Sequence, residues 1–533
     1  MSEDSTLTIA RSAKIFLSGT FLSRATGMLR DVSMAFCFGA HPAIAAFMVA
    51  FRFSHLFRRL FGESALSSSF IPHFEKIRKE SSEEGAKFFR DLSFSLFLLL
   101  SLIVCVCEVG LFSALKWGAL SDSTKEIITL SMLMLPGVVF ICLFALNAAL
   151  LQCEKKFFLS SGAPALFNIF WILAVLLLNT HTPKEAALYL SFAVTIAFVV
   201  QWLSTLPASL KFLRKHLSLK ECFKINPFSS HLKVLVRSFA LTVLGVGAVQ
   251  INSALDAVFA RASSLEGPAY LWYAIRMEQL PLALFGIALA SALLPPLSRA
   301  IEAADFSRYR ELLGFALRKG FSLMLPCTMA IFVLGASSVN VLYGRGDFTS
   351  EAILHTTFCL WGYGLSLIPS CFVILLAPAF YAKKQYLIPT LASAFSVLIN
   401  CLLNALFVFV FEWGAFAIAI GTSFAAAFNF YFLSYFLSKK VGSFFPRAVL
   451  LSFAKTTVCG LVAAGGTLLI GHFLIQDPTL SIVLGMPYAF PSSFLMQFLH
   501  FSVLTAIFGL LFLSYAFLLK LEDIPLLSRL RKA

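Results

Sequence analysis

Charged side chains are scarce in this sequence of 533 residues. Asp, Glu, Lys and Arg make up 13% of it, whereas hydrophobic residues make up 59%. Soluble domains have roughly 25% charged and roughly 45 to 50% apolar residues. The mean hydropathy is +0.86. A chain so poor in charge is not expected to form a water-soluble domain, so its composition predicts a polytopic membrane protein.

Nucleotide-binding and hydrolytic motifs are also missing. The sequence contains no G-x-x-x-x-G-K-[ST], no H-E-x-x-H and no G-x-S-x-G, and no polar stretch is long enough for a soluble catalytic domain. The eleven cysteines are scattered, and the one close pair, Cys105 and Cys107, lies in an apolar run where C-x-C is not a metal-ligand set. We therefore expect neither an enzyme nor a resident cofactor or metal.

Long apolar runs dominate the sequence instead. Each can cross the roughly 30 Å hydrocarbon core as a helix, and none shows the short alternating segments of a membrane barrel. The expected fold is an all-α polytopic membrane protein with fourteen transmembrane helices. The runs lie near residues 15–38, 43–71, 88–115, 127–152, 163–180, 185–209, 233–260, 268–297, 314–343, 352–381, 386–411, 414–437, 449–473 and 496–520.

The distribution of basic residues predicts the orientation of these helices. Of the 42 Lys and Arg residues, 31 lie in the two tails and in the loops after even-numbered helices, whereas 5 lie in the loops after odd-numbered helices. Loops rich in Lys and Arg stay on the cytoplasmic side. Both termini are therefore expected in the cytoplasm, with the first span as its own signal anchor. Because the net charge of +15 serves orientation, nucleic-acid binding is not expected.

The sequence repeats itself at a constant offset of 224 residues. Residues 45–72 align with 269–296 without gaps, and eight positions between residues 50 and 72 are identical, among them Arg52 with Arg276. We therefore predict two related six-helix lobes of the same orientation, residues 1–212 and 213–440, followed by two further helices within 441–533. A cleft between such lobes is where transporter sites generally lie.

The six arginines that are not counted with the tails and loops lie within the apolar runs. Besides Arg276 they are Arg24, Arg30, Arg52, Arg58 and Arg59. A charge at bilayer depth costs at least ~2.5 kcal/mol, so these side chains are expected to face water, a partner or an anionic ligand. Arginine binds phosphate through two parallel hydrogen bonds and stays protonated in any environment.

Two acidic residues accompany these arginines. Asp31 follows Arg30, and Glu63 shares a helical face with Arg52 and Arg59. The pattern predicts one polar wall of a water-filled cavity. The alternative is that Arg58 and Arg59 extend to the membrane interface and that Arg30 merely pairs with Asp31.

A second polar set lies mostly in the second half of the chain. It contains Asp256 in the seventh run, Asn400 and Asn404 one turn apart in the eleventh, and Thr422 early in the twelfth. Oxygen ligands of this type suit a cation such as Na⁺. The alternative is that the amides and the hydroxyl join helices by hydrogen bonds. The same two interpretations, cavity or helix contact, apply to Gln250 and Asn252.

Five segments resemble the MurJ/MviN family of lipid II flippases, whose superfamily also contains multidrug antiporters and polysaccharide-lipid flippases. The segments are SRATGMLRD, FGAHPAIAAFMVAFRFSHLFRRLFGESALSSSFIP, AIRMEQLPLALFGIALASALLPPLSR, LYGRGDFTSEA and LAPAFYAKKQYLIPT. Their order and spacing, together with fourteen spans, extend the resemblance from about residue 8 to about residue 520.

The resemblance implies a V-shaped pair of lobes around a cationic cavity in the bacterial cytoplasmic membrane, with the last two helices as a groove for a lipid tail. The cargo would be lipid II, the undecaprenyl-pyrophosphate-linked disaccharide pentapeptide, moved to the outer leaflet by alternating access for peptidoglycan synthesis. Cell-wall synthesis and division proteins would be its protein partners. The family's cavity residues fall on Arg24, Arg30, Arg52, Arg58 and Arg276, with Asp31 and Glu63 as acidic companions.

Four positions depart from the family's pattern. Ala45 and Ile275 stand where an acid is common, and Ile374 stands where a basic residue is common. Gln385 replaces the acid of FYAxxD. A gating salt bridge through these positions is therefore not expected, whereas the phosphate-binding arginines are unaffected.

Two other functions stay open from the sequence. A multidrug or other polyprenyl-sugar exporter of the same superfamily would be expected to carry acids rather than five arginines in its first lobe. A membrane scaffold for cell-wall enzymes would need no transport. Because no ATP-binding motif is present, energy is expected to come from the membrane potential or from an ion gradient.

Overall fold

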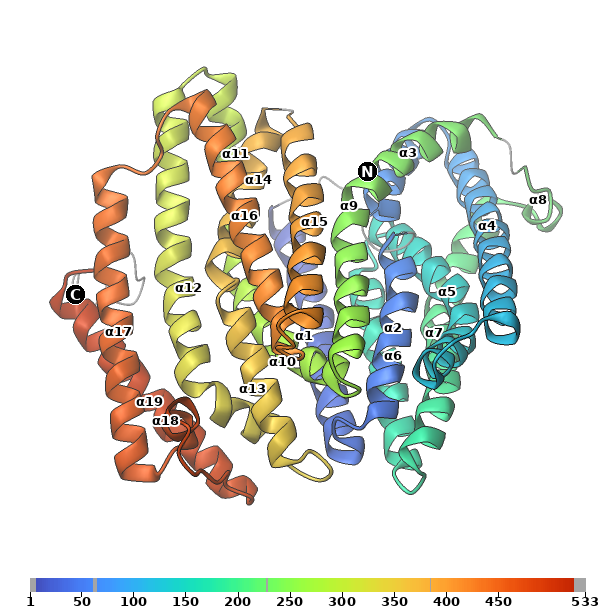
Figure 1. The fold of residues 1–533 in the computed structure, drawn as a ribbon. Helices are drawn as coiled ribbons and strands as arrows, with labels where there is room; N and C mark the ends of the chain where they lie inside the picture. Colours follow the sequence, from blue (N-terminus) through green and yellow to red (C-terminus); the bar gives the residue numbers. More distant parts are fainter. Residues whose placement is uncertain (1–5, 61–64, 227–228, 384, 522–533) are drawn as a thin grey trace. The chain divides into compact units, whose positions relative to one another are not determined.

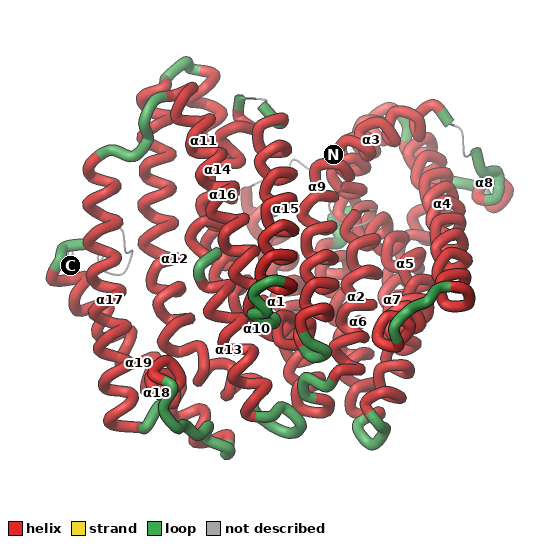
Figure 2. Tube along the Cα trace, in the orientation of Figure 1, coloured by secondary structure: helices red, strands yellow, loops and turns green. Residues whose placement is uncertain are grey.

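The computed structural model describes residues 6–60, 65–226, 229–383 and 385–521, and all regular structure in these ranges is helical (Figure 1). Figure 2 shows the same chain without a strand in its described part. Glu63 lies outside the described residues. The first helices are α1 (Thr6–Phe38), α2 (Pro42–Arg58), α3 (Ala65–Glu80), α4 (Ser82–Trp117), α5 (Asp122–Cys153), α6 (Phe157–Leu178), α7 (Pro183–His216), α8 (Leu219–Cys222) and α9 (Ser230–Ser263).

A π-helix, η2, and ten α-helices follow. They are α10 (Gly267–Pro281), η2 (Leu282–Gly286), α11 (Ile287–Glu302), α12 (Phe306–Tyr343), α13 (Ser350–Gly364), α14 (Leu367–Ala382), α15 (Leu387–Phe409), α16 (Phe416–Val441), α17 (Arg447–Ile475), α18 (Pro478–Leu484) and α19 (Phe494–Leu518).

Ten helical segments in the described ranges are long and apolar enough to cross a membrane, with α10 to α11 counted as one. The pair α13 and α14 makes an eleventh when taken as one span, bent by 40° at the short break between the helices. An all-helical, multi-span membrane protein is thereby confirmed. The full count of fourteen spans stays a prediction.

Contacts divide the chain into two compact units, Met1–Ala257 and Val258–Ala533. In the first unit α5 is central and packs against α2, α4 and α7, while α1 packs along α6. Gly19 permits the close approach of α1 to α6, because a Cβ atom there would lie 2.1 Å from Oγ of Ser161 and 2.9 Å from the backbone nitrogen of Gly162. Small residues at such crossings are typical of membrane helices.

In the second unit the long helix α12 contacts α13, α14, α17 and α19. Helices α17 and α19 also pack on each other, at the red end of the colour scale in Figure 1. One buried cluster joins α11, α12, α14 and α16 through residues such as Leu317, Leu375 and Leu437. The bend between α13 and α14 lies beside α10 and α12, where it is held by packing from both sides.

The internal repeat has a counterpart in the backbone. Arg59 and Leu60 leave α2 in a π-helical conformation, and Leu282–Gly286 forms the π-helix that follows α10. With the offset of 224 residues, these two irregularities fall at the same register. π-Helical turns are rare and are frequent at functional sites. The repeat therefore preserves both an arginine, Arg52 or Arg276, and the wide turn that follows it.

Candidate functional site

Arg30 is buried where α1 packs against α6, with 7% of its surface exposed. Its Nε and Nη2 atoms donate to Oδ1 of Asp31 at 3.0 and 2.7 Å, and its Nη1 donates to Oδ1 of Asn168 at 3.0 Å. The guanidinium carbon also lies 4.6 Å from the ring centre of Trp171. The buried charge is thus paired, hydrogen-bonded and stacked, which is what a low-dielectric interior requires.

Asn168 links this pair to the backbone of α1. Its Nδ2 atom donates to the carbonyl of Ser23 at 3.0 Å and to Oγ1 of Thr26 at 3.2 Å. Neither Asn168 nor Trp171 was identified from the sequence. The signal was present, because Asn168 lies in the interior of the apolar run 163–180 and a polar group inside a membrane helix usually has a role.

The same arrangement occurs at Arg90 and Asp91, far along the chain. Nε and Nη2 of Arg90 donate to Oδ1 of Asp91 at 2.8 and 2.6 Å. The backbone nitrogen of Asn226 donates to the same oxygen, and Arg90 also donates to the carbonyl of Glu221. This second pair therefore attaches the segment after α7 to α4. The pairing of Arg30 with Asp31 that the alternative interpretation named is present, and the bond from Arg30 to Asn168 joins α1 to α6. Whether the two residues also bind a ligand stays a prediction.

Arg52 of α2 and Arg59, the residue that follows α2, reach α9. Nη1 of Arg52 donates to the carbonyl of Ser253 at 3.2 Å, and Nη1 of Arg59 donates to Oε1 of Gln250 at 3.3 Å. Both acceptors are uncharged. Hydrogen bonds from a guanidinium to phosphate are shorter and about twice as strong as bonds between neutral groups. A phosphate oxygen could therefore replace these acceptors without leaving a charge unpaired.

Arg24 and Arg58 differ in their surroundings. Arg24 is exposed on α1, and its side chain forms no ion pair or hydrogen bond with the described part of the chain. Arg58 is half-buried in the last turn of α2. Arg24 is therefore a cation that a ligand can reach directly. Whether Arg58 binds a ligand stays a prediction.

Arg276 lies in the second unit, on α10. Its guanidinium carbon lies 4.5 Å from the ring centre of Trp272, one turn earlier on the same helix. The side chain is half-buried. Arg30 and Arg276 thus make the same kind of cation–π contact, because each lies over the face of a tryptophan, where the ring quadrupole attracts a cation. The tryptophan orients the guanidinium group without neutralising its charge.

The predicted cation ligands occupy two places in the described structure. Nδ2 of Asn252 donates to Oδ2 of Asp256 at 3.3 Å on α9, in the first unit. Asn400 and Asn404 are buried on α15, in the second unit. A Cβ atom on Gly421 would lie 2.3 Å from Oδ1 of Asn404 and 3.2 Å from Oδ1 of Asn400, so both amides converge on α16 there.

Thr422, the fourth predicted ligand, donates its hydroxyl to the carbonyl of Ile418 on its own helix at 2.9 Å. Among the described residues no group of three His, Cys, Asp or Glu side chains could hold a metal ion. The two amides and the adjacent Gly421 also fit the alternative, a contact between helices. A cation site here stays a prediction.

Gln385, which stands in place of a family acid, is hydrogen-bonded to a lysine. Nζ of Lys440 donates to Oε1 of Gln385 at 2.6 Å, between the start of α15 and the end of α16. Both side chains are at the surface. A neutral acceptor thus occupies a place where the family pattern would give an ion pair, and a hydrogen bond at an exposed position holds the helices only weakly.

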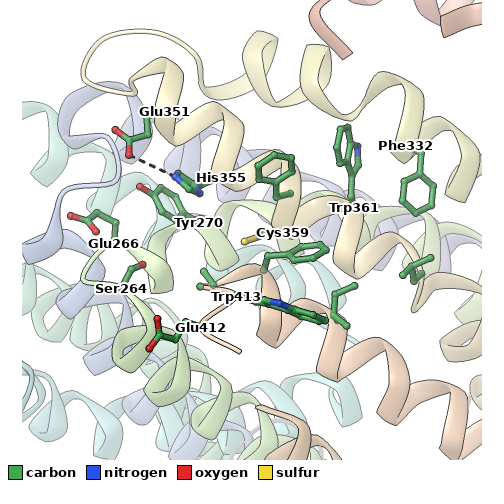
Figure 3. Close-up of a pocket in the computed structure, with 16 residues that line it drawn as sticks. Ser264, Glu266, Tyr270, Phe332, Glu351, His355, Cys359, Trp361, Glu412 and Trp413 are labelled. Carbon is green, nitrogen blue, oxygen red and sulfur yellow. Dashed lines mark ion pairs between the residues drawn. The ribbon is translucent and has the colours of Figure 1, made fainter. Parts of the chain in front are cut away.

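A cavity of about 780 Å³ lies at one end of the second unit, and the sequence did not predict it (Figure 3). Three of its lining residues are Glu266, Glu351 and Glu412. Nε2 of His355 lies 3.7 Å from Oε1 of Glu351, and the His355 ring stacks on Tyr270 with 5.1 Å between ring centres. An acidic, aromatic cavity repels phosphate. This cavity is therefore not a candidate site for an anion, and anion binding by the arginines stays a prediction.

The sequence is similar to those of known proteins. The family model described as "Lipid II flippase MurJ" matches residues 34–487. A probable lipid II flippase MurJ of Chlamydia pneumoniae is 33% identical over 98% of this chain and 94% of its own length. The lipid II flippase MurJ of Burkholderia cenocepacia is 29% identical over 77% of this chain and 80% of its own length.

Solved structures are similar at the level of the fold. The inward closed conformation of a lipid II flippase MurJ superposes with a TM-score of 0.71 at 23% identity, covering 92% of this chain and 98% of the other. An inward-facing multidrug resistance MATE transporter superposes with a TM-score of 0.65 at 15% identity, covering 81% and 98%. Identities this low establish a common fold only.

The two kinds of arginine differ in what their removal should do to stability. Arg30→Ala leaves the buried Asp31 carboxylate without its cation, so we expect a loss of about 3 to 5 kcal/mol of stability. Arg24→Ala removes an exposed side chain and should change stability by less than about 0.5 kcal/mol. Thermal unfolding of the purified proteins in detergent measures both. Equal melting temperatures for the two variants would show that the Arg30–Asp31 pair is not structural.

Proposed function

Because the chain belongs to the lipid II flippase MurJ family, we propose that it moves the diphosphate headgroup of lipid II across the membrane on the arginines of α1, α2 and α10. The protein is a flippase and not an enzyme. Its family and its apolar spans make it a multi-span protein of the bacterial inner membrane.

One observation supports this use of the arginines above all others: Arg52 donates to a backbone carbonyl, Arg276 lies over the face of Trp272, and Arg24 is exposed, so each of these contacts leaves the positive charge of the arginine in place. Two phosphates must lose bulk water when a headgroup crosses, which is costly unless hydrogen bonds replace the water. Charge-assisted bonds from guanidinium groups supply that replacement. The prenyl chain can stay in the lipid, so only the headgroup needs this path.

The proposed flippase has fourteen spans and both termini in the cytoplasm. Three long helices, α1, α2 and α9, would complete the ten apolar spans and the bent span α13–α14. Charge explains why α1 lacks the apolar signature, since it contains Arg24, Arg30 and Asp31. In this proposal the twelve spans before α17 form two six-helix lobes, with α17 and α19 added after them. The excess of Lys and Arg in the loops after even-numbered helices supports this orientation.

The membrane potential is the simplest driving force in this proposal. An anionic headgroup that leaves a negative cytoplasm gains about 2.3 kcal/mol per charge per 100 mV. Na⁺ binding by Asp256, Asn400, Asn404 and Thr422 would add a second energy source. Cell-wall synthesis and division proteins remain proposed partners, supported by the family resemblance alone and testable by co-purification.

Neither the exporter function nor the scaffold function is favoured by a specific observation. The similarity to multidrug transporters concerns the fold, and the arginines suit an anion rather than the cationic drugs that acids would bind. A scaffold without transport would not flip lipid after reconstitution, so the experiment below separates it from a flippase.

Single replacement of Arg24, Arg52 or Arg276 by alanine should slow lipid II flipping in reconstituted vesicles. Loss of one charge-assisted hydrogen bond costs about 1.5 to 3 kcal/mol, which corresponds to a rate roughly 10- to 150-fold lower. Arg308→Ala is the matched control, because Arg308 lies at the surface and, in the described part of the chain, forms its ion pair with exposed Glu311. Wild-type rates in all three variants would rule out the arginine mechanism, and absence of flipping by the wild-type protein would rule out the function.

The Na⁺ part of the proposal has its own test. Flipping is measured with and without a Na⁺ gradient, and the stimulation by Na⁺ should disappear in Asp256→Asn because the carboxylate is the charged ligand. Asp122→Asn is the control, since that acid is fully exposed at the start of α5. If Asp256→Asn keeps the wild-type response to Na⁺, the four residues are helix contacts rather than a cation site.

A further inference from the structure

Glu278 is a buried acid that the proposed mechanism does not use. It lies on α10, two residues after Arg276, with 6% of its surface exposed. Its one hydrogen bond in the described structure joins Oε1 to Oγ of Ser366 at 3.3 Å. A carboxyl group enclosed in an apolar helix packing calls for an explanation, because burying its charge without a partner is costly.

No cation neutralises Glu278 in the described part of the chain. On its own helix, the guanidinium group of Arg276 lies over Trp272 instead. Charged or titratable side chains on the elements packed against α10 form no ion pair or hydrogen bond with it. They are Arg308, Tyr309, Arg310, Glu311, Arg318, Lys319, Cys327 and Tyr343 on α12 and Glu351, His355, Cys359 and Tyr363 on α13, and η2 contains none.

Ser366 stands at the bend between α13 and α14, which meet at 40°. Its Oγ atom lies 2.7 Å from the carbonyl oxygen of Tyr363, and its backbone nitrogen donates to the same carbonyl at 2.9 Å. These two bonds close the turn where α13 ends. The hydroxyl of Ser366 therefore takes part in the bend itself as well as in the contact with Glu278.

The number of available protons limits which of these groups can donate. A serine hydroxyl has one proton to donate and accepts through its lone pairs. The shorter bond, at 2.7 Å, goes to a carbonyl that can only accept, so the hydroxyl donates there. The hydroxyl can therefore donate to Glu278 only if it gives up the bond to Tyr363, whereas a protonated carboxyl group can donate to Ser366 and leave that bond in place.

We propose that Glu278 is a proton-binding site, and that its proton fixes the bend of the α13–α14 span through the chain Glu278 to Ser366 to Tyr363. When the proton leaves, the carboxylate competes with the Tyr363 carbonyl for the one hydroxyl proton. Ser366 then turns from the bend toward α10, and the turn that closes α13 loses a hydrogen bond. The proton is thus a second ligand of the transporter, bound on the same helix as Arg276.

Infrared difference spectroscopy tests the proton site without any transport. Spectra of the purified protein across about pH 5 to about pH 9, a range in which a buried carboxyl can change its charge, should show the carbonyl stretch of a protonated acid. That band should be lost in Glu278→Gln and kept in the control Glu351→Gln, since Glu351 is exposed at the start of α13. A spectrum in which Glu278→Gln removes no such band would overturn the proposal.

Two more variants test the link to the bend. Gln mimics the protonated carboxyl group, because its amide is neutral and can donate to Ser366. Glu278→Gln should therefore flip lipid at a rate independent of pH, whereas the wild-type rate changes with pH. Ser366→Ala removes the hydroxyl that accepts from Glu278, so the carbonyl band of Glu278 should shift to that of a free acid. This variant also tests the coupling if Glu278→Gln does not fold. An unshifted band in Ser366→Ala, or a wild-type pH profile in Glu278→Gln, would contradict the coupling.

The coupling rests on the proposed flippase function, but the proton site does not. If the wild-type protein shows the carbonyl band and flips no lipid, the flippase proposal fails while the proton site stands. If flipping is normal and the band is absent, the proton site fails while the flippase proposal stands.

Discussion

The cost of placing a cationic charge inside an apolar helix governs this structure. Four of the arginines have a specific contact that reduces that cost. Arg30 has Asp31 and Asn168, Arg52 and Arg59 have uncharged oxygens of α9, and Arg276 has the face of Trp272. The kind of partner separates the roles, because a carboxylate cancels a charge, whereas a carbonyl or an aromatic ring leaves it available to an anion.

Helix α10 combines two charges of different kinds. Arg276 keeps its charge under all conditions, since a guanidinium group does not lose its proton in proteins. Glu278, two residues away, is a group whose charge can change, and among the described residues its hydrogen-bond partner is the serine at the bend of α13–α14. The π-helix that follows on η2 weakens the regular backbone at the same place. Arg276, proposed to bind the cargo, and Glu278, proposed to control the bend, thus lie within one turn of α10.

The sequence predicted the features that depend on local pattern and failed where distant residues decide. Apolar runs predicted the helical membrane fold, and the offset of 224 residues predicted the shared register at Arg52 and Arg276. The contacts of Arg30 with Asn168 and of Glu278 with Ser366 join residues 138 and 88 positions apart, and no local pattern encodes such a pairing. Thr422 differs from these, because its hydroxyl donates to the carbonyl of Ile418 on its own helix.

The central claim is that arginines recognise the diphosphate of the cargo, and lipid binding tests it most directly. Native mass spectrometry can compare the binding of undecaprenyl diphosphate with that of undecaprenol, which has the same chain and no phosphate. The account predicts strong preference for the diphosphate in the wild-type protein and a preference at least about tenfold weaker when Arg24 and Arg52 are both alanine. Equal binding of the two lipids by the wild-type protein would contradict it.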